Sequence, residues 1–454
     1  MIAFLLGCPG EGSDSAPKDT ADTADTADAY TRPLGSFDLA DARLVVRGEA
    51  AGDQLGSAVT QGDLDGDGVS EFLVSAPGGG SGGTVYLYSG GTTGVHVATD
   101  ADVRFGGSVA SALGTGLAVV GDIDGNGLPE VVLGAPGYGD AAGRVYVFEG
   151  RFDDRPPLMT AAATVDGEAV GDQFGVEVQD LGDLDGDGHA EIGVGAWFSD
   201  GNGVDSGRVY VFGDVDGAVL ASAARFAVDG EAPSDWFGYS FVGGHDVDGD
   251  SIVDLLVGAD GVDLGADSLE GAAYLYAGPL PTVSPTRVVG DGPGAFAGHA
   301  VVTLPGFAAV GAFGTGPSRR GAVGIFAGGM ASGALADAAV VIPGLTDSGL
   351  FGYALASPGD IDGDGLADLV ASARDDGTVA AETGATWVIY APFSATPDLA
   401  SNAAVLLGEA EGDASGYTLS GGGDGSGDGH PDVVVGAWKA GERDEGAAYL
   451  WDGG

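Results

Sequence analysis

Short apolar runs alternate with glycine- and aspartate-rich turns along most of the chain, from about residue 37 onward. One run, Phe72–Ala76, is almost wholly apolar and predicts a strand that is buried on both faces. A later run, Val85–Tyr88, alternates and predicts a half-buried strand. No run has the 3.6-residue period of an amphipathic helix. The pattern therefore predicts an all-β protein made of many short strands.

The same order of runs recurs along the chain. Each repeat has a Phe-Gly pair or a close variant, an Asp-rich loop, an apolar run ending in Gly-Ala or Ser-Ala, a variable loop and an alternating run. The Asp-rich loops open at Asp63, Asp122, Asp183, Asp246, Asp360 and Asp424. Their spacings are 59, 61, 63, 114 and 64 residues, so one repeat without its loop is expected in the long gap. Residues 289–329 carry the flanking pieces of that repeat and no acidic loop.

Four short strands in each of seven repeats are typical of a seven-bladed β-propeller with four-stranded blades. The small residues of Leu55–Val59 predict the inner strand of the first blade. The last repeat stops after its third strand, Ala447–Trp451. A spare segment near the N-terminus, Ala42–Arg47, is similar to the pieces that end earlier repeats. We expect this segment to complete the seventh blade and so to remove an open sheet edge.

The composition agrees with a glycine-rich, acidic β protein. The 88 glycines fit many tight turns, and the hydrophobic fraction of 44% with a mean hydropathy of +0.17 argues against general disorder. Lys and Arg number 16 against 68 Asp and Glu, a formal net charge of −52. Such a surface repels nucleic acids and anionic lipid heads, and it favours cations as partners. A single cysteine excludes an internal disulfide, and no segment has the roughly 20 apolar residues of a membrane-spanning helix.

The Asp-rich loops predict calcium sites. The first loop, Asp63–Glu71, carries carboxylates at positions 1, 3, 5 and 9. Calcium prefers six to eight oxygen ligands, and alternate positions of a tight, glycine-containing loop turn toward one point. A simple turn is the alternative for any one loop, but all six loops share the acid at position 9. An EF-hand is excluded because its last ligand is at position 12 and helices flank its loop.

Each loop offers five candidate ligands, at positions 1, 3, 5, 7 and 9, with position 7 contributing its backbone carbonyl. These ligands are Asp63, Asp65, Asp67, Val69, Glu71, Asp122, Asp124, Asn126, Leu128, Glu130, Asp183, Asp185, Asp187, His189, Glu191, Asp246, Asp248, Asp250, Ile252, Asp254, Asp360, Asp362, Asp364, Leu366, Asp368, Asp424, Ser426, Asp428, His430 and Asp432. Asn126 and Ser426 are neutral donors, so their two sites are expected to be weaker. We expect about six structural Ca²⁺ ions, whose removal lowers the melting temperature.

The repeated Phe-Gly, Asp-x-Asp-x-Asp-Gly-x-x-Asp and Gly-Ala-Pro elements resemble the FG-GAP repeat of integrin α-subunit propellers and their bacterial relatives. Gly134–Pro136 and Ser75–Pro77 carry the last element, whereas Gly195–Trp197 and Gly436–Trp438 depart from it. The resemblance covers residues 37–454. It implies that the calcium loops join the first and second strands of each blade, on the face opposite the ligand-binding one. Integrins usually have fewer metal loops, so six would be a bacterial elaboration.

The N-terminal segment resembles the start of a bacterial lipoprotein. Residues 1–8 end in an apolar stretch and Cys8, similar to a lipobox in which the cysteine is lipidated. The stretch is short and lacks a basic residue, and a chance apolar start is the alternative. Residues 9–36 include an Asp-Thr-Ala repeat and are expected to be a flexible tether before the propeller of residues 37–454. The expected location is the bacterial cell envelope, as an outer-membrane or cell-surface lipoprotein, or secretion.

No catalytic constellation is evident. None of the five histidines is placed as a general base beside a Ser or Cys nucleophile, and the carboxylates are expected to bind calcium. We therefore expect a protein that is not an enzyme.

A partner is expected on the variable loops away from the calcium, because aromatic and arginine side chains are frequent contact anchors. The candidates are Trp197, Phe198, Trp236, Arg319, Arg320, Trp438, Lys439 and Arg443. The two tryptophans that replace proline are alternatively simple packing residues.

The partner is expected to be an unknown protein at the cell surface, bound by an adhesion module. A glycan bound by a lectin-like propeller and an architectural spacer without a specific ligand are the alternatives. No nucleic-acid partner is expected. Contact with a membrane is expected only through a lipid anchor at Cys8.

Overall fold

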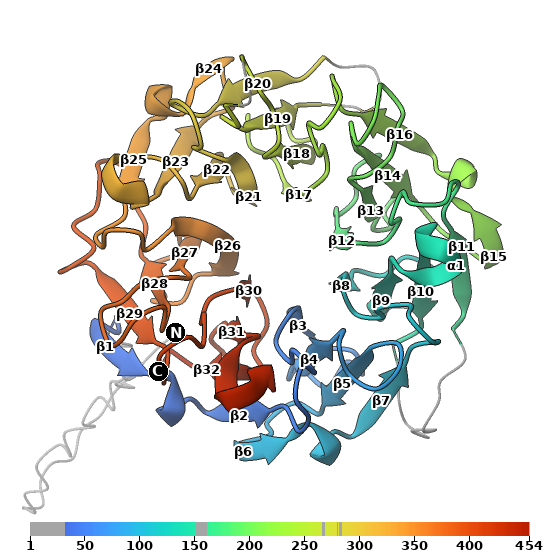
Figure 1. Ribbon diagram of the computed structural model, residues 1–454, viewed down its shortest axis with the longest axis horizontal. Helices are drawn as coiled ribbons and strands as arrows, with labels where there is room; N and C mark the ends of the chain where they lie inside the picture. The colour runs from blue at the N-terminus through green and yellow to red at the C-terminus, as the bar shows by residue number, and fades with distance from the viewer. Residues whose placement is uncertain (1–31, 151–160, 266–267, 279, 281–283, 454) are drawn as a thin grey trace, which may run out of the picture.

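The computed structural model describes residues 32–150, 161–265, 268–278, 280 and 284–453. In this part of the chain, seven sheets are arranged in a ring, and the first of the four strands of each blade lies nearest the centre of the ring (Figure 1). The prediction of a seven-bladed β-propeller with four-stranded blades is therefore confirmed. Cys8 and residues 1–31 lie outside the described residues. No described helix is long and apolar enough to cross a membrane.

Each blade is a meander of four antiparallel strands, ordered from the centre of the ring outward. Blade 1 consists of β3 (Val59–Gly62), β4 (Glu71–Ala76), β5 (Thr84–Tyr88) and β7 (Val103–Gly106). Blade 2 consists of β8 (Leu117–Val120), β9 (Glu130–Ala135), β10 (Arg144–Phe148) and β11 (Ala163–Asp166). Blade 3 consists of β12 (Glu177–Asp180), β13 (Ile192–Ala196), β14 (Arg208–Phe212) and β16 (Phe226–Asp229). Blade 4 consists of β17 (Ser240–His245), β18 (Asp254–Ala259), β19 (Ala272–Tyr276) and β20 (Thr286–Val289).

The remaining blades follow the same plan. Blade 5 consists of β21 (Ala297–Leu304), β22 (Phe307–Ala312), β23 (Ala322–Ala327) and β25 (Val340–Pro343). Blade 6 consists of β26 (Phe351–Gly359), β27 (Asp368–Ala373), β28 (Ala385–Ile389) and β29 (Ala403–Leu407). Blade 7 consists of β30 (Thr418–Ser420), β31 (Val433–Ala437), β32 (Ala447–Trp451) and β2 (Leu44–Arg47). In blade 5, only Pro305 and Gly306 join the first two strands.

The N-terminal strand closes the ring, as the sequence predicts. β2 pairs antiparallel with β32, with Val45 opposite Tyr449, and thereby supplies the fourth strand of blade 7. Leu44, Val45 and Val46 are all buried. The first and last parts of the chain therefore share one sheet, and the edge that β32 would otherwise present is paired with β2.

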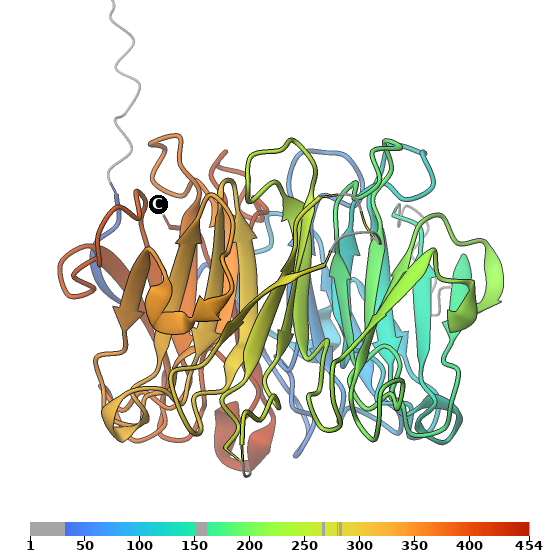
Figure 2. The same cartoon turned by 90° about the horizontal axis from the view of Figure 1, so that it is seen from above.

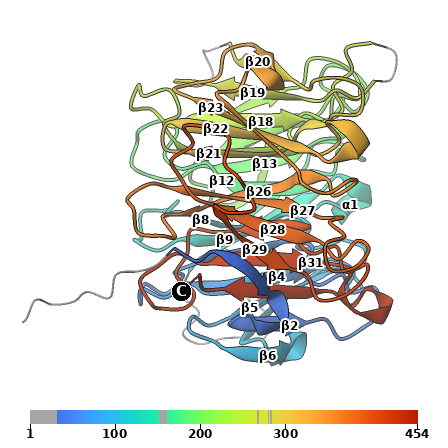
Figure 3. The ribbon, with the colours of Figure 1, turned by 90° about the vertical axis from the view of Figure 1, so that its left-hand side faces the viewer.

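Four sheets carry a fifth strand at their outer edge. These clasp strands are β1 (Gly35–Asp38) on β29, β6 (Gly94–Val97) on β2, β15 (Gly217–Leu220) on β11 and β24 (Gly333–Ala334) on β20. All four pair in parallel, and each belongs by sequence to the blade that follows the one it joins. Figure 3 shows β6 beside β2 in this arrangement. Each clasp strand therefore links two neighbouring blades.

A short 3₁₀ turn with a buried first residue follows each clasp strand. These turns are η1 (Leu39–Asp41), η2 (Ala98–Asp100), η3 (Ala221–Ala223) and η5 (Leu335–Asp337). Three other helical turns lie between the second and third strands of their blades. They are α1 (Tyr138–Ala141), η4 (Pro317–Arg319) and the π-type turn η6 (Ala440–Asp444).

The Phe-Gly pairs pack each blade against the one before it. Phe174, Phe237 and Phe351 are each about 1% exposed, and each forms an isolated parallel bridge to a glycine of the preceding blade. The glycine of the pair has a positive φ, +85° at Gly238, where a Cβ would lie 2.7 Å from a methyl group of Val209. The phenylalanine thus fills the interface, and the glycine lets the backbone approach it.

Two strand predictions are corrected. The inner strand of blade 1 begins at Val59, because Leu55 is instead used in the bridge to Gly446 of blade 7. The third strand, β5, is buried along Val85–Tyr88 rather than half-buried. Both of its faces are covered because neighbouring blades pack against each sheet from either side.

Candidate functional sites

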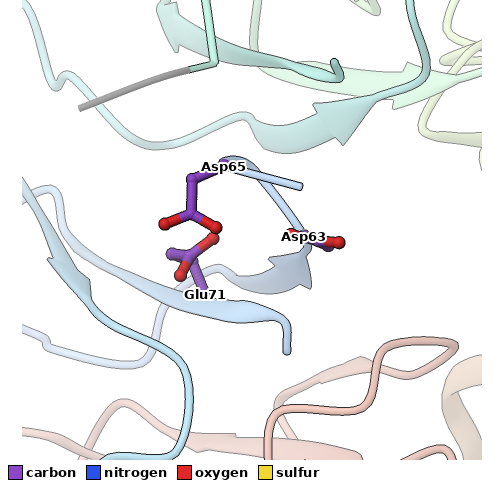
Figure 4. Close-up of side chains that lie close together, drawn as sticks. All are labelled: Asp63, Asp65 and Glu71. Atoms are coloured by element: carbon purple, nitrogen blue, oxygen red, sulfur yellow. The ribbon is translucent and has the colours of Figure 1, made fainter. Parts of the chain in front are cut away.

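The Asp-rich loops lie where the resemblance places them, between the first and second strands of a blade. The first runs from the end of β3 to the start of β4. In Figure 4, Asp65 and Glu71 turn their carboxylates toward each other across this loop. In five loops, three carboxylates have oxygen atoms within 4.8 Å of one another. These groups are Asp63, Asp65 and Glu71; Asp122, Asp124 and Glu130; Asp183, Asp185 and Glu191; Asp246, Asp248 and Asp250; and Asp360, Asp362 and Asp368.

Backbone hydrogen bonds explain why alternate side chains of the loop converge. Asp63 Oδ1 accepts the N–H groups of Gly66 and Asp67, at 2.8 and 3.1 Å. Its Oδ2 accepts the N–H of Gly68 at 2.9 Å. Gly66 and Gly68 have φ of +78° and +92°, which curls the chain around the first carboxylate. The carboxylates at positions 3 and 5 each accept the N–H two residues later, as Asp65 does from Asp67 at 3.1 Å.

The acid at position 9 is buried in every loop, and it is the first residue of the second strand in four loops and directly precedes that strand in the third and seventh. In every loop but the seventh, one of its oxygens accepts the N–H at position 2, as Glu71 Oε2 does from Leu64 at 2.9 Å. Glu130 Oε1 and Asp432 Oδ1 are buried and have no hydrogen-bond partner among the described residues. A buried carboxylate oxygen without a partner is costly, and a bound cation removes that cost. This donor set therefore fits a hard cation that prefers oxygen.

The electrostatics of position 9 agree with this interpretation. Burial, together with the like charge of the other loop carboxylates, raises the pKa of Glu130, Glu191, Asp368 and Asp432 to about 7. Burial likewise raises the pKa of Glu71 and of Asp254. The ionised form of these acids is therefore disfavoured when only neighbouring carboxylates face it. A divalent cation would supply the missing positive charge, and Ca²⁺ at these loops stays a prediction.

Two loops differ in detail. In the fourth, Asp254 lies outside the close cluster and accepts the N–H groups of Val247 and Gly278, at 2.8 and 3.0 Å. In the seventh, the Ser426 hydroxyl donates to Asp424 Oδ1 at 3.1 Å, and its N–H donates to Asp432 Oδ2 at 2.7 Å. The seventh loop thus keeps the hydrogen bonds to its first carboxylate, but its position-9 acid accepts from position 3 and, like the second loop, it has one carboxylate fewer.

Among the described residues, two arginines form ion pairs with carboxylates of metal loops, which the loop pattern alone did not predict. Arg225 contacts Asp185 closely and lies 2.9 Å from Asp187 Oδ2 and 3.0 Å from Glu191 Oε1. Arg32 contacts Asp362 closely and lies 3.7 Å from an oxygen of Asp364. Both are distant in sequence from the loops that they enter, so no local spacing marks them. Their guanidinium groups partly neutralise the third and sixth loops.

The inner strands begin at the end opposite the metal loops. Figure 2 shows the strands running between the two faces of the disc. Residues after each Phe-Gly pair and after each Gly-Ala pair therefore lie together at the face away from the metal loops. A cavity of about 620 Å³ opens there and is lined by residues from all seven blades. We call it the mouth cavity.

One wall of the mouth cavity is an arc of rings from blades 3 to 7. The ring centroids of successive neighbours are 4.3 Å (Trp197 and Tyr239), 4.6 Å (Tyr239 and His299), 4.5 Å (His299 and Tyr353), 5.7 Å (Tyr353 and Tyr417) and 5.3 Å (Tyr417 and Trp438) apart. All six residues are partly buried, and the His299 side chain is only 9% exposed. His299 Nδ1 lies 2.8 Å from Asp260 Oδ2, a contact that fixes the imidazole ring.

The other wall is polar and comes from blades 1 to 3. Its side chains include Gln54, Ser57, Thr115, Glu177 and Gln179. Gln179 Nε2 donates to Glu177 Oε1 at 2.7 Å. Burial raises the pKa of Glu177 to about 7, and the bond from Gln179 opposes this shift. The mouth cavity thus has an aromatic side and a hydrogen-bonding side.

The candidate contact residues lie in three kinds of place. Trp197 and Trp438 line the mouth cavity, and Phe198 packs on Trp197 with centroids 5.4 Å apart. Trp236 is half-buried outside the cavity lining. The remaining four candidates are cations on the same face, of which Arg319, Arg320 and Arg443 are exposed and Lys439 is half-buried.

Tyr239, His299, Tyr353 and Tyr417 line the cavity but were not among the contact residues predicted from the sequence. A signal for them exists, because all four directly follow the glycine of the Phe-Gly position in four consecutive repeats.

The comparisons with known proteins agree with the geometry. A family model described as FG-GAP repeat matches residues 55–88, 113–148 and 351–389. Integrin alpha-4 of Xenopus laevis is 33% identical over 176 residues, which cover 36% of this chain and 17% of the relative. Integrin alpha-5 of Xenopus laevis is 31% identical over 227 residues, or 46% of this chain and 20% of the relative. Integrin alpha-6 of Homo sapiens is 31% identical over 196 residues, which cover 41% of this chain and 16% of the relative.

The matched part is thus about a fifth or less of the length of these relatives. The resemblance to FG-GAP repeats and to integrin α-subunits is confirmed. Bacterial origin and lipidation stay predictions.

Proposed function

We propose that this integrin α-like FG-GAP propeller is a calcium-stabilised, adhesion-type module whose protein partner docks on the face around the mouth cavity. The observation that carries the proposal is the separation of the two kinds of site. Acidic clusters lie at one end of the inner strands, and an open cavity with an aromatic arc lies at the other. The relatives named integrin alpha support a protein partner over other classes.

Calcium has a structural role in this proposal. Each loop fixes the turn between the first two strands of its blade, and its buried acid lies at the start of the second strand or directly before it. Six divalent ions would also offset about twelve of the negative charges that otherwise repel one another. None of the predicted ligands lies in the mouth cavity, so the ions stiffen the blades without touching the partner.

The docking face has rigid loops and the rare cations of an acidic chain. Helical turns α1, η4 and η6 all lie on this face, between second and third strands. Arg319 and Arg320 are exposed there, and Arg320 pairs with Asp347 at 2.6 Å. Loops held by rigid strands are common binding surfaces. A cell-surface location with a lipid anchor at Cys8 completes the proposal.

A pull-down from cell-envelope extract, with the calcium-saturated chain as bait, tests the docking face. Arg319→Glu is expected to reduce the retained partner strongly. Arg104→Glu, on the outer strand of blade 1, is the matched control and is expected to retain it. Equal retention by both variants, or no protein retained by the unaltered chain, would contradict the proposal.

A further inference from the structure

We infer that the mouth cavity is a binding site for a neutral saccharide, with one face of a sugar ring on the aromatic arc and its hydroxyls on the polar wall. The inference goes beyond the proposed function because the ligand is a small carbohydrate held inside the mouth cavity. It needs no protein partner and no contact with the metal loops.

The aromatic wall supplies a stacking surface of suitable shape. Its six rings come from five consecutive blades and line the cavity, and His299 is the least exposed of them, with 9% of its side chain exposed. Successive centroids are 4.3–5.7 Å apart, which makes the wall continuous. The C–H face of a sugar ring is apolar and packs favourably on such rings, while the ring edges stay polar.

The polar wall supplies groups that both donate and accept hydrogen bonds. Ser57 and Thr115 carry hydroxyls, and Gln54 and Gln179 carry amides. Sugar hydroxyls also donate and accept, so each can pair with such a group as it leaves water. A ligand with an apolar face and a polar edge therefore matches the two walls together.

Charge on the rim favours a neutral ligand over an organic cation. The chain's own cations already lie over aromatic rings of this face. Arg374 Cζ is 4.3 Å from the Tyr353 centroid, and Lys439 Nζ is 5.1 Å from the Trp438 centroid. A second cation would meet their repulsion. An acidic sugar is disfavoured by Glu177 and by the net charge of −52.

The size of the cavity fits one or two sugar rings. Its volume of about 620 Å³ lies within the range of roughly 300–1,000 Å³ that is common for small-ligand sites. The opening lies on the axis of the propeller, so a terminal sugar of a longer glycan can enter while the rest stays outside.

Calorimetric titration of the full, calcium-saturated chain tests the inference. The probes are glucose, galactose, mannose, N-acetylglucosamine and their common disaccharides, with choline as the cationic probe and glucuronate as the acidic one. At least one neutral sugar is expected to bind. Failure of every neutral sugar at millimolar concentration, or preferential binding of choline or glucuronate, would overturn the inference.

Variants on each wall locate the site. Tyr417→Ala and Gln179→Ala are expected to weaken sugar binding at least tenfold, one from each wall. Tyr146→Ala removes a half-buried tyrosine outside the cavity and is expected to leave affinity unchanged. Melting curves check that all three variants fold, and the second wall variant keeps the test valid if one does not. Equal affinities for the two wall variants and the control would overturn the assignment. If the chain binds a sugar but retains no envelope protein in the pull-down, the saccharide site is supported and the proposed protein-docking function is contradicted.

Discussion

Arg225 places a guanidinium group among three carboxylates of the third metal loop. A calcium ion at this loop must compete with that charge. We predict that Arg225→Ala raises the calcium affinity of one site by roughly threefold to tenfold, since only one competing charge is removed. Terbium luminescence or calorimetric titration measures the change.

Arg104→Ala is the control for this prediction, because it removes an exposed cation that contacts no metal loop. An equal change in both variants would mean that Arg225 acts only through the overall charge of the chain.

Glu130 is a buried acid at position 9 with one oxygen that has no partner. We predict that Glu130→Gln lowers the melting temperature in excess calcium, because the second loop loses a charged ligand. In excess chelator the same variant is expected to be at least as stable as the unaltered chain, since repulsion from Asp122 and Asp124 is relieved. Calorimetry with and without chelator measures both effects.

Glu411→Gln, at an exposed acid outside the loops, is expected to shift neither melting curve. A uniform shift of Glu130→Gln under both conditions would indicate a packing role rather than a metal role.

Glu177 predicts a pH dependence of stability. Burial raises its folded pKa to about 7, above the unfolded value of about 4.3. The folded state therefore holds the proton more tightly, and this contribution to stability is complete below pH of about 4 and lost as the pH rises through about 7. The charge of Glu177 also acts on Tyr239 and Tyr417. Burial raises the pKa of both tyrosines above their ordinary value, so neither tyrosine titrates in the pH range over which Glu177 does.

We predict that Glu177→Gln flattens this dependence. At about pH 8 the variant is expected to exceed the unaltered chain in unfolding free energy by on the order of 2 kcal/mol, with a smaller difference at about pH 5. Urea unfolding in excess calcium measures it. A pH-independent difference between the two chains would refute the assigned pKa.

At the scale of residues, the sequence predicted the metal loops better than the cavity. Ligands such as Asp63, Asp65 and Glu71 lie within nine positions, so their spacing alone brings them together. Tyr239 and Trp438 are nearly 200 residues apart, and only closure of the ring brings them to one wall. Arg225 likewise reaches its loop through packing that no local pattern shows.

The Phe-Gly pair is the element that joins blade to blade. Phe351 is about 1% exposed and packs between the strands of blades 5 and 6. We predict that Phe351→Ala lowers the unfolding free energy by about 3–5 kcal/mol, because it leaves a cavity in that interface. Chemical unfolding in calcium measures the loss.

Leu345→Ala removes a side chain that is 52% exposed in the same region and is expected to change stability by less than about 0.5 kcal/mol. Similar losses in the two variants would show that the interface does not depend on the phenylalanine.

At the scale of elements, the alternation and burial patterns predicted four strands in each repeat but not the clasp strands. Gly94–Val97 is short and mostly exposed, so no apolar face marks it as part of a sheet. Its pairing is parallel and joins the sheet of another blade, which turn signals cannot indicate. The burial of β5 on both faces was missed for a similar reason, because the covering side chains belong to neighbouring blades.

Ring closure is a property of the whole molecule. β2 completes blade 7, and its first three residues are buried. We predict that deletion of residues 2–47 abolishes cooperative unfolding or lowers the melting temperature by more than 10 °C, roughly the effect of several kcal/mol in a chain of this size. Deletion of residues 2–31 is the control and is expected to leave the transition unchanged. Equal melting of the two truncated chains would contradict closure by β2.

The clasp strands divide the junctions of the ring into two mechanical classes. They bind blade 6 to 7, 7 to 1, 2 to 3 and 4 to 5, while the junctions 1–2, 3–4 and 5–6 have no such strand among the described residues. Under tension, the disc is therefore expected to part first along these three seams. The described chain begins at Arg32, beside β1, so a pull from that end enters the block of blades 6, 7 and 1. A load applied there meets the most strongly joined part of the ring first.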